Sequence, residues 1–269
     1  MKFGARIGVL RQPWDKVYDE AARLGFNGVE MEVGAEYQKA EVLVADQRAQ
    51  ILKMMRATGV ETSCVCIGGY WKWSPADKDP AVRAEAVKIM KLTLEACDRL
   101  NARCILAPLS NPNATPEEAV QRWIEFCKTI APDAQKHHVT VGVEICTRPK
   151  LATHQDAMAI VNAVRSEFVQ VYWDVANARH AGADAVEGIR FLGKEHLAHI
   201  HIKDIKANPL GSKSPFTGCH LGEGVLDFAA ICKAIKEVGY DGWLTLETIS
   251  DADASASAKK NLEYLKSKL

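Results

Sequence analysis

Four ionisable residues lie near the carboxyl ends of four successive apolar runs in the second half of the sequence: Glu144, Asp174, His201 and Glu247. In the run Val141–Glu144, for example, valines alternate with glycine and glutamate. Since the side chains of a strand alternate between its two faces, we expect all four residues to point away from the apolar face. Buried charges need a partner of opposite charge or a metal ion. The pattern therefore predicts one divalent metal ion held by these four side chains.

Three carboxylates and one imidazole suit Mn²⁺ first and then Mg²⁺ or Co²⁺, and they also accommodate Zn²⁺ or Fe²⁺. Lys203 is an inward-facing cation of the same runs, and it could pair with a carboxylate or steady a substrate oxygen. The alternative is four separate polar residues in buried hydrogen-bond networks. The presence of one such residue on each of four consecutive runs favours the metal site.

These runs belong to a pattern in which strand-like and helical segments alternate along the whole sequence. Strands are predicted at Arg6–Leu10, Gly28–Val33, Glu61–Ile67, Cys104–Leu109, Thr140–Cys146, Val169–Val175, Leu197–Lys203 and Trp243–Ile249. Helices are predicted at about Trp14–Leu24, Asp46–Thr58, Ala81–Leu100, Pro116–His137, His154–Arg165, Ala183–Leu192, Asp227–Val238 and Ala254–Lys268. Eight such repeats predict an α/β fold, a (β/α)₈ TIM barrel that forms a single domain over residues 1–269.

Enzymes of this fold have their active sites at the carboxyl ends of the barrel strands, which is where the four ionisable residues are predicted to lie. The longest irregular stretch, Ile205–Val225, follows the seventh strand on that side. We therefore expect it to be a functional loop.

The composition limits the kind of partner. The 269 residues include 34 Lys and Arg and 34 Asp and Glu, so the formal net charge is zero. Nucleic-acid-binding and membrane-binding proteins usually show a basic excess, so we expect neither partner, and instead a small substrate of low charge. No apolar run reaches the roughly 18 residues of a membrane span, and Met1–Arg6 lacks the apolar core of a signal peptide. Eight scattered cysteines without a Cys-x-x-Cys pair predict a reduced, cytoplasmic enzyme.

Several short motifs along the sequence carry a resemblance to a known family. They are Gly25–Glu30, Val143–Glu144, Trp173–Asp174, His199–Asp204, Leu221–Phe228 and Gly242–Glu247. In these motifs the chain resembles the xylose isomerase-like barrel superfamily, and within it the sugar-phosphate isomerase and epimerase group that includes ketose 3-epimerases of the D-tagatose 3-epimerase type. The resemblance covers essentially the whole chain, and it implies metal ligation by the same four residues that the strand alternation selects.

The resemblance also implies a reaction. The metal would hold a keto sugar through its carbonyl and a neighbouring hydroxyl, which acidifies the adjacent C–H and stabilises an enediolate. Glu144 and Glu247 would lie on opposite sides of the sugar, one removing a proton and the other returning one. Return to the same carbon is epimerisation, and return to a different carbon is isomerisation.

Two positions differ from the epimerases of this group. Those enzymes usually have a histidine three residues after the aspartate of strand six, where this chain has Asn177, which could bind a sugar hydroxyl; His180 further along could compensate. The segment after Glu144 lacks their usual aromatic residue and second glutamate. Its Arg148 or Lys150 could instead bind an anionic group of the substrate.

Other residues are predicted around the site. Trp71, with Trp73, could enclose the sugar after strand three, and His220 and Glu223 of the long loop could contact it. Glu30 and Glu32 point inward from strand two, either to the substrate or to the barrel core. His199 is expected below His201 in a supporting role. Arg11 after strand one is a surface charge or an anion contact.

Three functional readings follow. The leading one is a metal-dependent isomerase or epimerase of a keto sugar, working as a homodimer or homotetramer. The second is a dehydratase or lyase of the inosose dehydratase type, in which a leaving group departs from the same enediolate. The third is a barrel that only binds sugars. The superfamily's three-zinc DNA-repair endonuclease is excluded, because its additional histidine ligands are absent where this chain has Cys66–Gly69, Leu106–Leu109 and Asn177.

Overall fold

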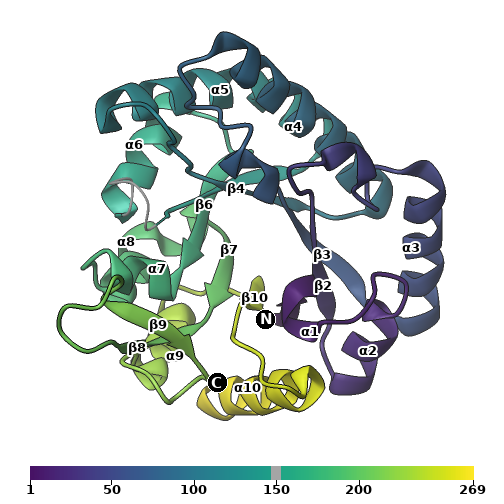
Figure 1. Cartoon of the computed structure of the whole chain (residues 1–269), viewed down its shortest axis with the longest axis vertical. Coiled ribbons are helices and arrows are strands. Elements are labelled where there is room, and N and C mark those ends of the chain that lie inside the picture. Colours follow the sequence, from purple (N-terminus) through teal and green to yellow (C-terminus); the bar gives the residue numbers. More distant parts are fainter. Residues whose placement is uncertain (147–152) are drawn as a thin grey trace.

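Eight parallel strands close into a barrel in the computed structural model, which describes residues 1–146 and 153–269. The barrel strands are β1 (Lys2–Arg6), β2 (Gly28–Glu32), β3 (Glu61–Cys66), β4 (Cys104–Pro108), β5 (Thr140–Glu144), β6 (Val169–Asp174), β7 (Leu197–Ile202) and β10 (Trp243–Leu246). Each strand pairs with the next around the ring, and β1 closes the circle by pairing with both β2 and β10. The predicted (β/α)₈ barrel is confirmed (Figure 1).

The outer layer consists of helices that follow the strands along the chain and surround the barrel (Figure 1). They are α2 (Val17–Leu24), α3 (Ala45–Thr58), α4 (Pro80–Leu100), α5 (Pro116–His137), α6 (His154–Val164), α8 (Ala185–His196), α9 (Phe228–Glu237) and α10 (Ala254–Lys268). The start of α5 shows why these helices begin where the sequence predicts. Thr115 and Glu118 form a reciprocal capping box around Pro116, which satisfies amide groups of the first turn.

The predicted position of the first strand is wrong. The strand was expected at Arg6–Leu10, but β1 ends at Arg6 and Ile7–Leu10 form a short helix, α1, which Arg11 ends with a left-handed φ of 48°. A four-residue apolar run fits a buried helical turn as well as a buried strand, so periodicity could not distinguish them. The shift moves Arg6 from the start of the first strand to its carboxyl end.

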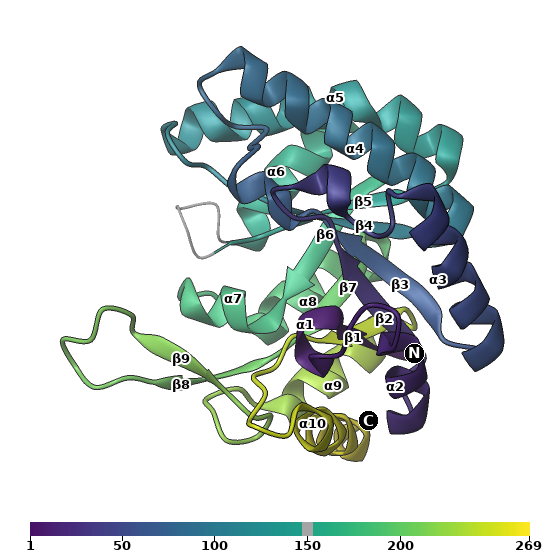
Figure 2. The ribbon, with the colours of Figure 1, turned by 45° about the vertical axis from the view of Figure 1, so that its right-hand side comes forward.

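Several short elements lie between the barrel strands and the outer helices. They are α7 (Val175–His180) and the 3₁₀ turns η1 (Tyr37–Lys39) and η2 (Gly68–Trp71). The expected irregular stretch after the seventh strand contains an antiparallel hairpin of β8 (Asp204–Ala207) and β9 (Phe216–Cys219). Figure 2 shows this hairpin extending away from the barrel beside α7.

Asp204 fixes the loop that follows the hairpin. Its buried carboxylate accepts hydrogen bonds from the amides of Ile205, Gly222 and Gly224 at 2.8, 3.0 and 3.0 Å, and from that of Leu226 at 3.3 Å. A β-carbon on Gly224 would collide with Asp204 Oδ1 and with the carbonyl oxygen of Ile205. The Gly-Glu-Gly motif is therefore a backbone cradle for this carboxylate.

The barrel interior below the candidate site is filled with aromatic and sulfur-containing side chains. Tyr172 stacks on His199 with 4.7 Å between ring centroids, and His199 Nε2 lies 2.6 Å from Thr245 Oγ1. Ala198, which strand alternation assigns to the outer face, packs against this interior group because β6 and β7 shift register between Val171 and Tyr172. His199 is thus a buried core residue one layer below His201, as predicted.

Candidate metal centre

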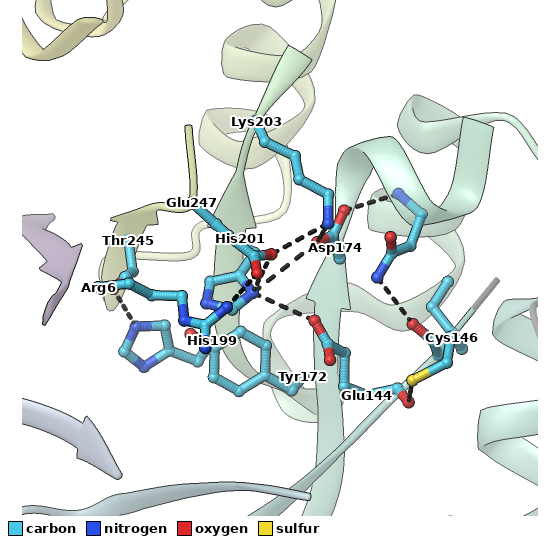
Figure 3. A network of polar contacts seen from close by, with 12 residues as sticks. Arg6, Glu144, Cys146, Tyr172, Asp174, His199, His201, Lys203, Thr245 and Glu247 are labelled. Carbon is cyan, nitrogen blue, oxygen red and sulfur yellow. Dashed lines mark hydrogen bonds and ion pairs between the residues drawn. The ribbon is translucent and has the colours of Figure 1, made fainter. Parts of the chain in front are cut away.

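The four predicted ligands come together at the carboxyl end of the barrel. Glu144 and Asp174 are the last residues of β5 and β6, His201 lies in β7, and Glu247 directly follows β10. Each offers one ligand atom, and these atoms lie within 4.8 Å of one another. Figure 3 shows the four side chains converging on one point. Parallel strands bring their carboxyl ends to the same rim, which is why residues so far apart in sequence meet there.

His201 presents Nδ1 to this group. That nitrogen lies 3.1 Å from Glu144 Oε1, 3.3 Å from Glu247 Oε2 and 3.8 Å from Asp174 Oδ2. Burial disfavours the cationic ring, but the carboxylates of Glu30 and Glu247 outweigh burial and raise the pKa of His201. The centre of the group therefore attracts positive charge.

The donor set fits a divalent cation. Asp174 is fully buried; its Oδ1 caps α7 by accepting the amides of Ala176 and Asn177 at 2.8 and 2.7 Å. Its Oδ2 forms no well-directed hydrogen bond, although Lys203 Nζ lies 2.8 Å away. A buried carboxylate oxygen with a free lone pair, facing two more carboxylates and an imidazole nitrogen, is suited to a cation that prefers oxygen ligands.

Two cations border the same carboxylates. Lys203 Nζ lies 2.8 Å from Asp174 Oδ2 and 3.0 Å from Glu247 Oε2. Arg6 binds the other oxygen of Glu247 through Nη1 and also contacts Glu32 at 3.2 Å. Sequence reasoning missed Arg6, since the misplaced first strand put it at the wrong end of the barrel.

The two glutamates differ in their electrostatic surroundings. Burial raises the pKa of Glu144, and the neighbouring Glu247 and Asp174 add to this effect. Burial would also raise the pKa of Glu247, but Lys203, His201 and Arg6 together hold it well below the usual range. Glu247 therefore stays ionised, whereas Glu144 holds a proton more readily.

A cavity of about 240 Å³ opens above the ligands and suits a small molecule. Glu144, His201 and Glu247 border it, together with Arg6 and Glu32. Three of the residues predicted to bind substrate also line this cavity: Trp71, Asn177 and Lys203.

The structure does not bring the other predicted contacts to this cavity. His180 lies 3.4 Å from Ser214 Oγ, between α7 and the hairpin. His220 is buried with its Nε2 2.8 Å from Asp251 Oδ2. Glu223 is exposed and pairs with Lys260. Their roles in substrate binding stay predictions.

Other sequence predictions have mixed outcomes. Arg148 lies outside the described residues, so its predicted anion contact also stays a prediction. Arg11 is exposed and donates to the carbonyl of Asp251.

The eight cysteines are all buried with free thiols. In the described ranges, 1–146 and 153–269, no helix is long and apolar enough to cross a membrane. Location and oligomeric state stay predictions.

An eight-stranded parallel barrel with three carboxylates and an imidazole at its carboxyl rim defines the class of TIM barrels with a possible metal site. The sequence model of the family described as "Xylose isomerase-like TIM barrel" matches residues 18–268. The chain belongs to this family, as the sequence motifs indicated.

Individual relatives agree with that assignment. L-ribulose-5-phosphate 3-epimerase UlaE of Escherichia coli K12 is 25% identical over 264 residues, which cover 95% of this chain and 90% of that protein. The predicted class, a sugar isomerase or epimerase, is confirmed by such relatives.

Solved structures share the fold. D-psicose 3-epimerase from Clostridium cellulolyticum H10, solved with D-tagatose, has a TM-score of 0.84 at 18% identity and covers 100% of this chain and 99% of its own. The zinc-bound IOLI protein has a TM-score of 0.81 at 16% identity. The match covers 100% of this chain and 96% of the IOLI chain.

Proposed function

We propose that this protein is a divalent-metal-dependent epimerase or isomerase of a keto sugar or a sugar derivative, with an enediolate as the intermediate form of the substrate. The observation that supports the proposal most directly is the pair of glutamates, Glu144 and Glu247, which border one small cavity and also belong to the group of four candidate ligands. Epimer-forming chemistry needs two proton-transferring groups that reach one carbon from different sides. Glu144 at the end of β5 and Glu247 just after β10 would be these two groups.

The four candidate ligands would hold the metal ion, with Mn²⁺ as the first choice for this donor set. When bound, the ion would supply positive charge that polarises the substrate carbonyl and makes the neighbouring C–H more acidic. Lys203, at the cavity wall between Asp174 and Glu247, would hold a substrate oxygen and balance carboxylate charge.

The two glutamates would have different tasks. Lys203 and Arg6 keep Glu247 ionised, so it is suited to accept a proton from the substrate carbon. Glu144 lies 3.1 Å from His201 Nδ1 and, among the described residues, has no Lys or Arg as an ion-pair partner, so it is suited to return a proton to the opposite face. In the reverse reaction the tasks exchange.

Substrate contacts are proposed for Asn177 and Trp71. Asn177 donates from Nδ2 to the carbonyl of Ile145 at 3.1 Å, which holds its side chain at the cavity wall beside the ligands. Trp71 follows β3, is 54% exposed and borders the same cavity, so its ring could cover the apolar face of a sugar.

Solvent exchange tests the proposal. The Mn²⁺-loaded protein is incubated in D₂O with a panel of free and phosphorylated pentuloses and hexuloses, and products are followed by NMR and mass spectrometry. We expect deuterium at the carbon next to the carbonyl, together with a new epimer or isomer. Absence of exchange with every sugar in the panel would refute the proposal. An absorbing enone product would instead assign the dehydratase reaction.

A further inference from the structure

The two ring nitrogens of His201 face different surroundings. Nδ1 points to the candidate ligand group, 3.1 Å from Glu144 Oε1. Nε2 points the opposite way, to the carboxylate of Glu30, at 3.1 Å from Oε1 and 3.2 Å from Oε2. Glu30 therefore lies behind His201 as seen from the metal centre.

Glu30 is fixed in that place by further contacts. It is 1% exposed, and Tyr172 donates its hydroxyl to Glu30 Oε2 at 2.7 Å. Arg6 Nε lies 3.4 Å from Glu30 Oε1. The ring of Tyr172 also packs edge-on against His201, with 4.6 Å between centroids. Burying a carboxylate is costly unless it is hydrogen-bonded and paired, and this one has three partners arranged around it.

An ionised carboxylate only accepts hydrogen bonds. The proton between Glu30 and His201 must therefore be on Nε2, which leaves the lone pair of a neutral ring on Nδ1, on the side of Glu144, Asp174 and Glu247. We infer that Glu30 is a positioning residue: it sets the tautomer and orientation of His201 so that Nδ1 can bind the metal ion. This inference rests on the proposed metal site.

Two features argue against a purely structural role for Glu30. A residue needed only to fill the barrel would be apolar, like Leu106 of β4, which packs in the interior cluster with Tyr172. Glu30 is also not a fifth ligand of the proposed centre, since its carboxylate meets the nitrogen of His201 that faces away from that centre. Carboxylate partners of this kind hold the ring of a metal-binding histidine and strengthen it as a ligand.

The affinity for Mn²⁺ tests the inference without any use of activity. Mn²⁺ is titrated into metal-free wild type and variants, and the free ion is measured by electron paramagnetic resonance. We expect Glu30→Gln to raise the Mn²⁺ dissociation constant about 10–100-fold. Glu30→Asp keeps the charge but shortens the side chain, and it should give a similar loss.

Glu32→Gln is the charge-matched control. Glu32 also pairs with Arg6 and borders the cavity, but within the described residues it makes no ion pair or hydrogen bond with His201. This variant loses the same charge as Glu30→Gln, and we expect its dissociation constant to change less than about threefold. Equal losses in both glutamine variants would show that only net charge matters and would overturn the inference.

A second readout needs no variant. Selective ¹⁵N labelling of the eight histidines in Mg²⁺-loaded wild type should show a slowly exchanging Nε2–H on His201. A proton on Nδ1 instead would overturn the inference even if Glu30 variants failed to fold.

Failure of wild type to bind Mn²⁺ refutes the proposed metal site itself. Tight binding in wild type with an unchanged constant in Glu30→Gln refutes only the role of Glu30.

Discussion

Lys203 and Glu247 form an ion pair across the rim of the barrel, with 3.0 Å between Nζ and Oε2. Arg6 binds the other oxygen of Glu247, so both of its carboxylate oxygens face a cation. Glu144, by contrast, has only His201 as an ionic partner within the described residues. The two glutamates therefore have different ionic surroundings, and their pKa values are shifted in opposite directions.

Replacement of either glutamate should stop turnover. We expect Glu144→Gln and Glu247→Gln each to lower kcat at least about 100-fold, because the amide neither transfers a proton nor ligates metal as a carboxylate does. Steady-state kinetics on the sugar identified by solvent exchange would measure this. Glu237→Gln, on the exposed pair with Arg190, is the control and should keep wild-type kcat. Full activity in either site variant would contradict the two-glutamate mechanism.

Metal binding should stabilise the fold measurably. Mn²⁺ at about 100 times its dissociation constant should add about 2.7 kcal/mol to the free energy of unfolding. For a domain of this size, that is a rise of roughly 5–10 °C in Tm. Differential scanning calorimetry with Mn²⁺ and with a chelator would measure the shift. Asp174→Asn should lose most of it, and a full shift in that variant would place the ion elsewhere.

The loop cradle around Asp204 should not tolerate a side chain at Gly224. We expect Gly224→Ala to lower the free energy of unfolding by about 2 kcal/mol or more, because the new methyl group displaces a buried carboxylate from its amide donors. Gly8→Ala is the matched control, since a β-carbon there meets nothing within 4 Å. Urea unfolding of both variants would compare them. Equal stabilities would show that the cradle is not rigid.

His199 should make the protein less stable in acid. Burial lowers its pKa to about 3, so the folded ring stays neutral. The unfolded chain takes up a proton there below about pH 6.5. This contribution to stability is therefore complete above about pH 6.5 and falls by about 1.4 kcal/mol per unit as the pH drops toward 3.

The difference in free energy of unfolding between wild type and His199→Gln isolates this effect, because His201 and the carboxylates titrate in both proteins. Measured in a chelator at several pH values, the wild type's advantage should shrink from pH 6.5 to pH 4. A difference that is constant with pH would mean that His199 is not buried in its neutral form.

The alternation of strands and helices predicted the barrel, and the alternation of side chains within each strand predicted which residues gather at its rim. Side chains alternate between the two faces of a strand, so the inner face can be identified without any knowledge of the neighbouring strands. This alternation assigned Glu144, Asp174, His201 and Glu247 each to an inner face. The same reasoning misassigned Ala198, since a register shift interrupts the period there. The alternation of side chains predicts their direction reliably only where the strand is regular.

Residues outside the strands could not be placed in this way. His180 and His220 lie outside the barrel strands, where they contact Ser214 and Asp251, and the sequence pattern contains no sign of those pairings. Arg6 could have been found, because Phe3 and Ala5 alternate with Gly4 and Arg6 just as apolar residues alternate in the other strands. The stronger apolar run that follows obscured that signal.

The pairing of β1 with β10 joins the first and last strands of the barrel. Glu247 follows the last barrel strand, while its partner Arg6 ends the first. The proposed metal centre would therefore receive its fourth ligand, already held by Arg6, only when these two strands have paired. A bound ion would then report that the barrel has closed.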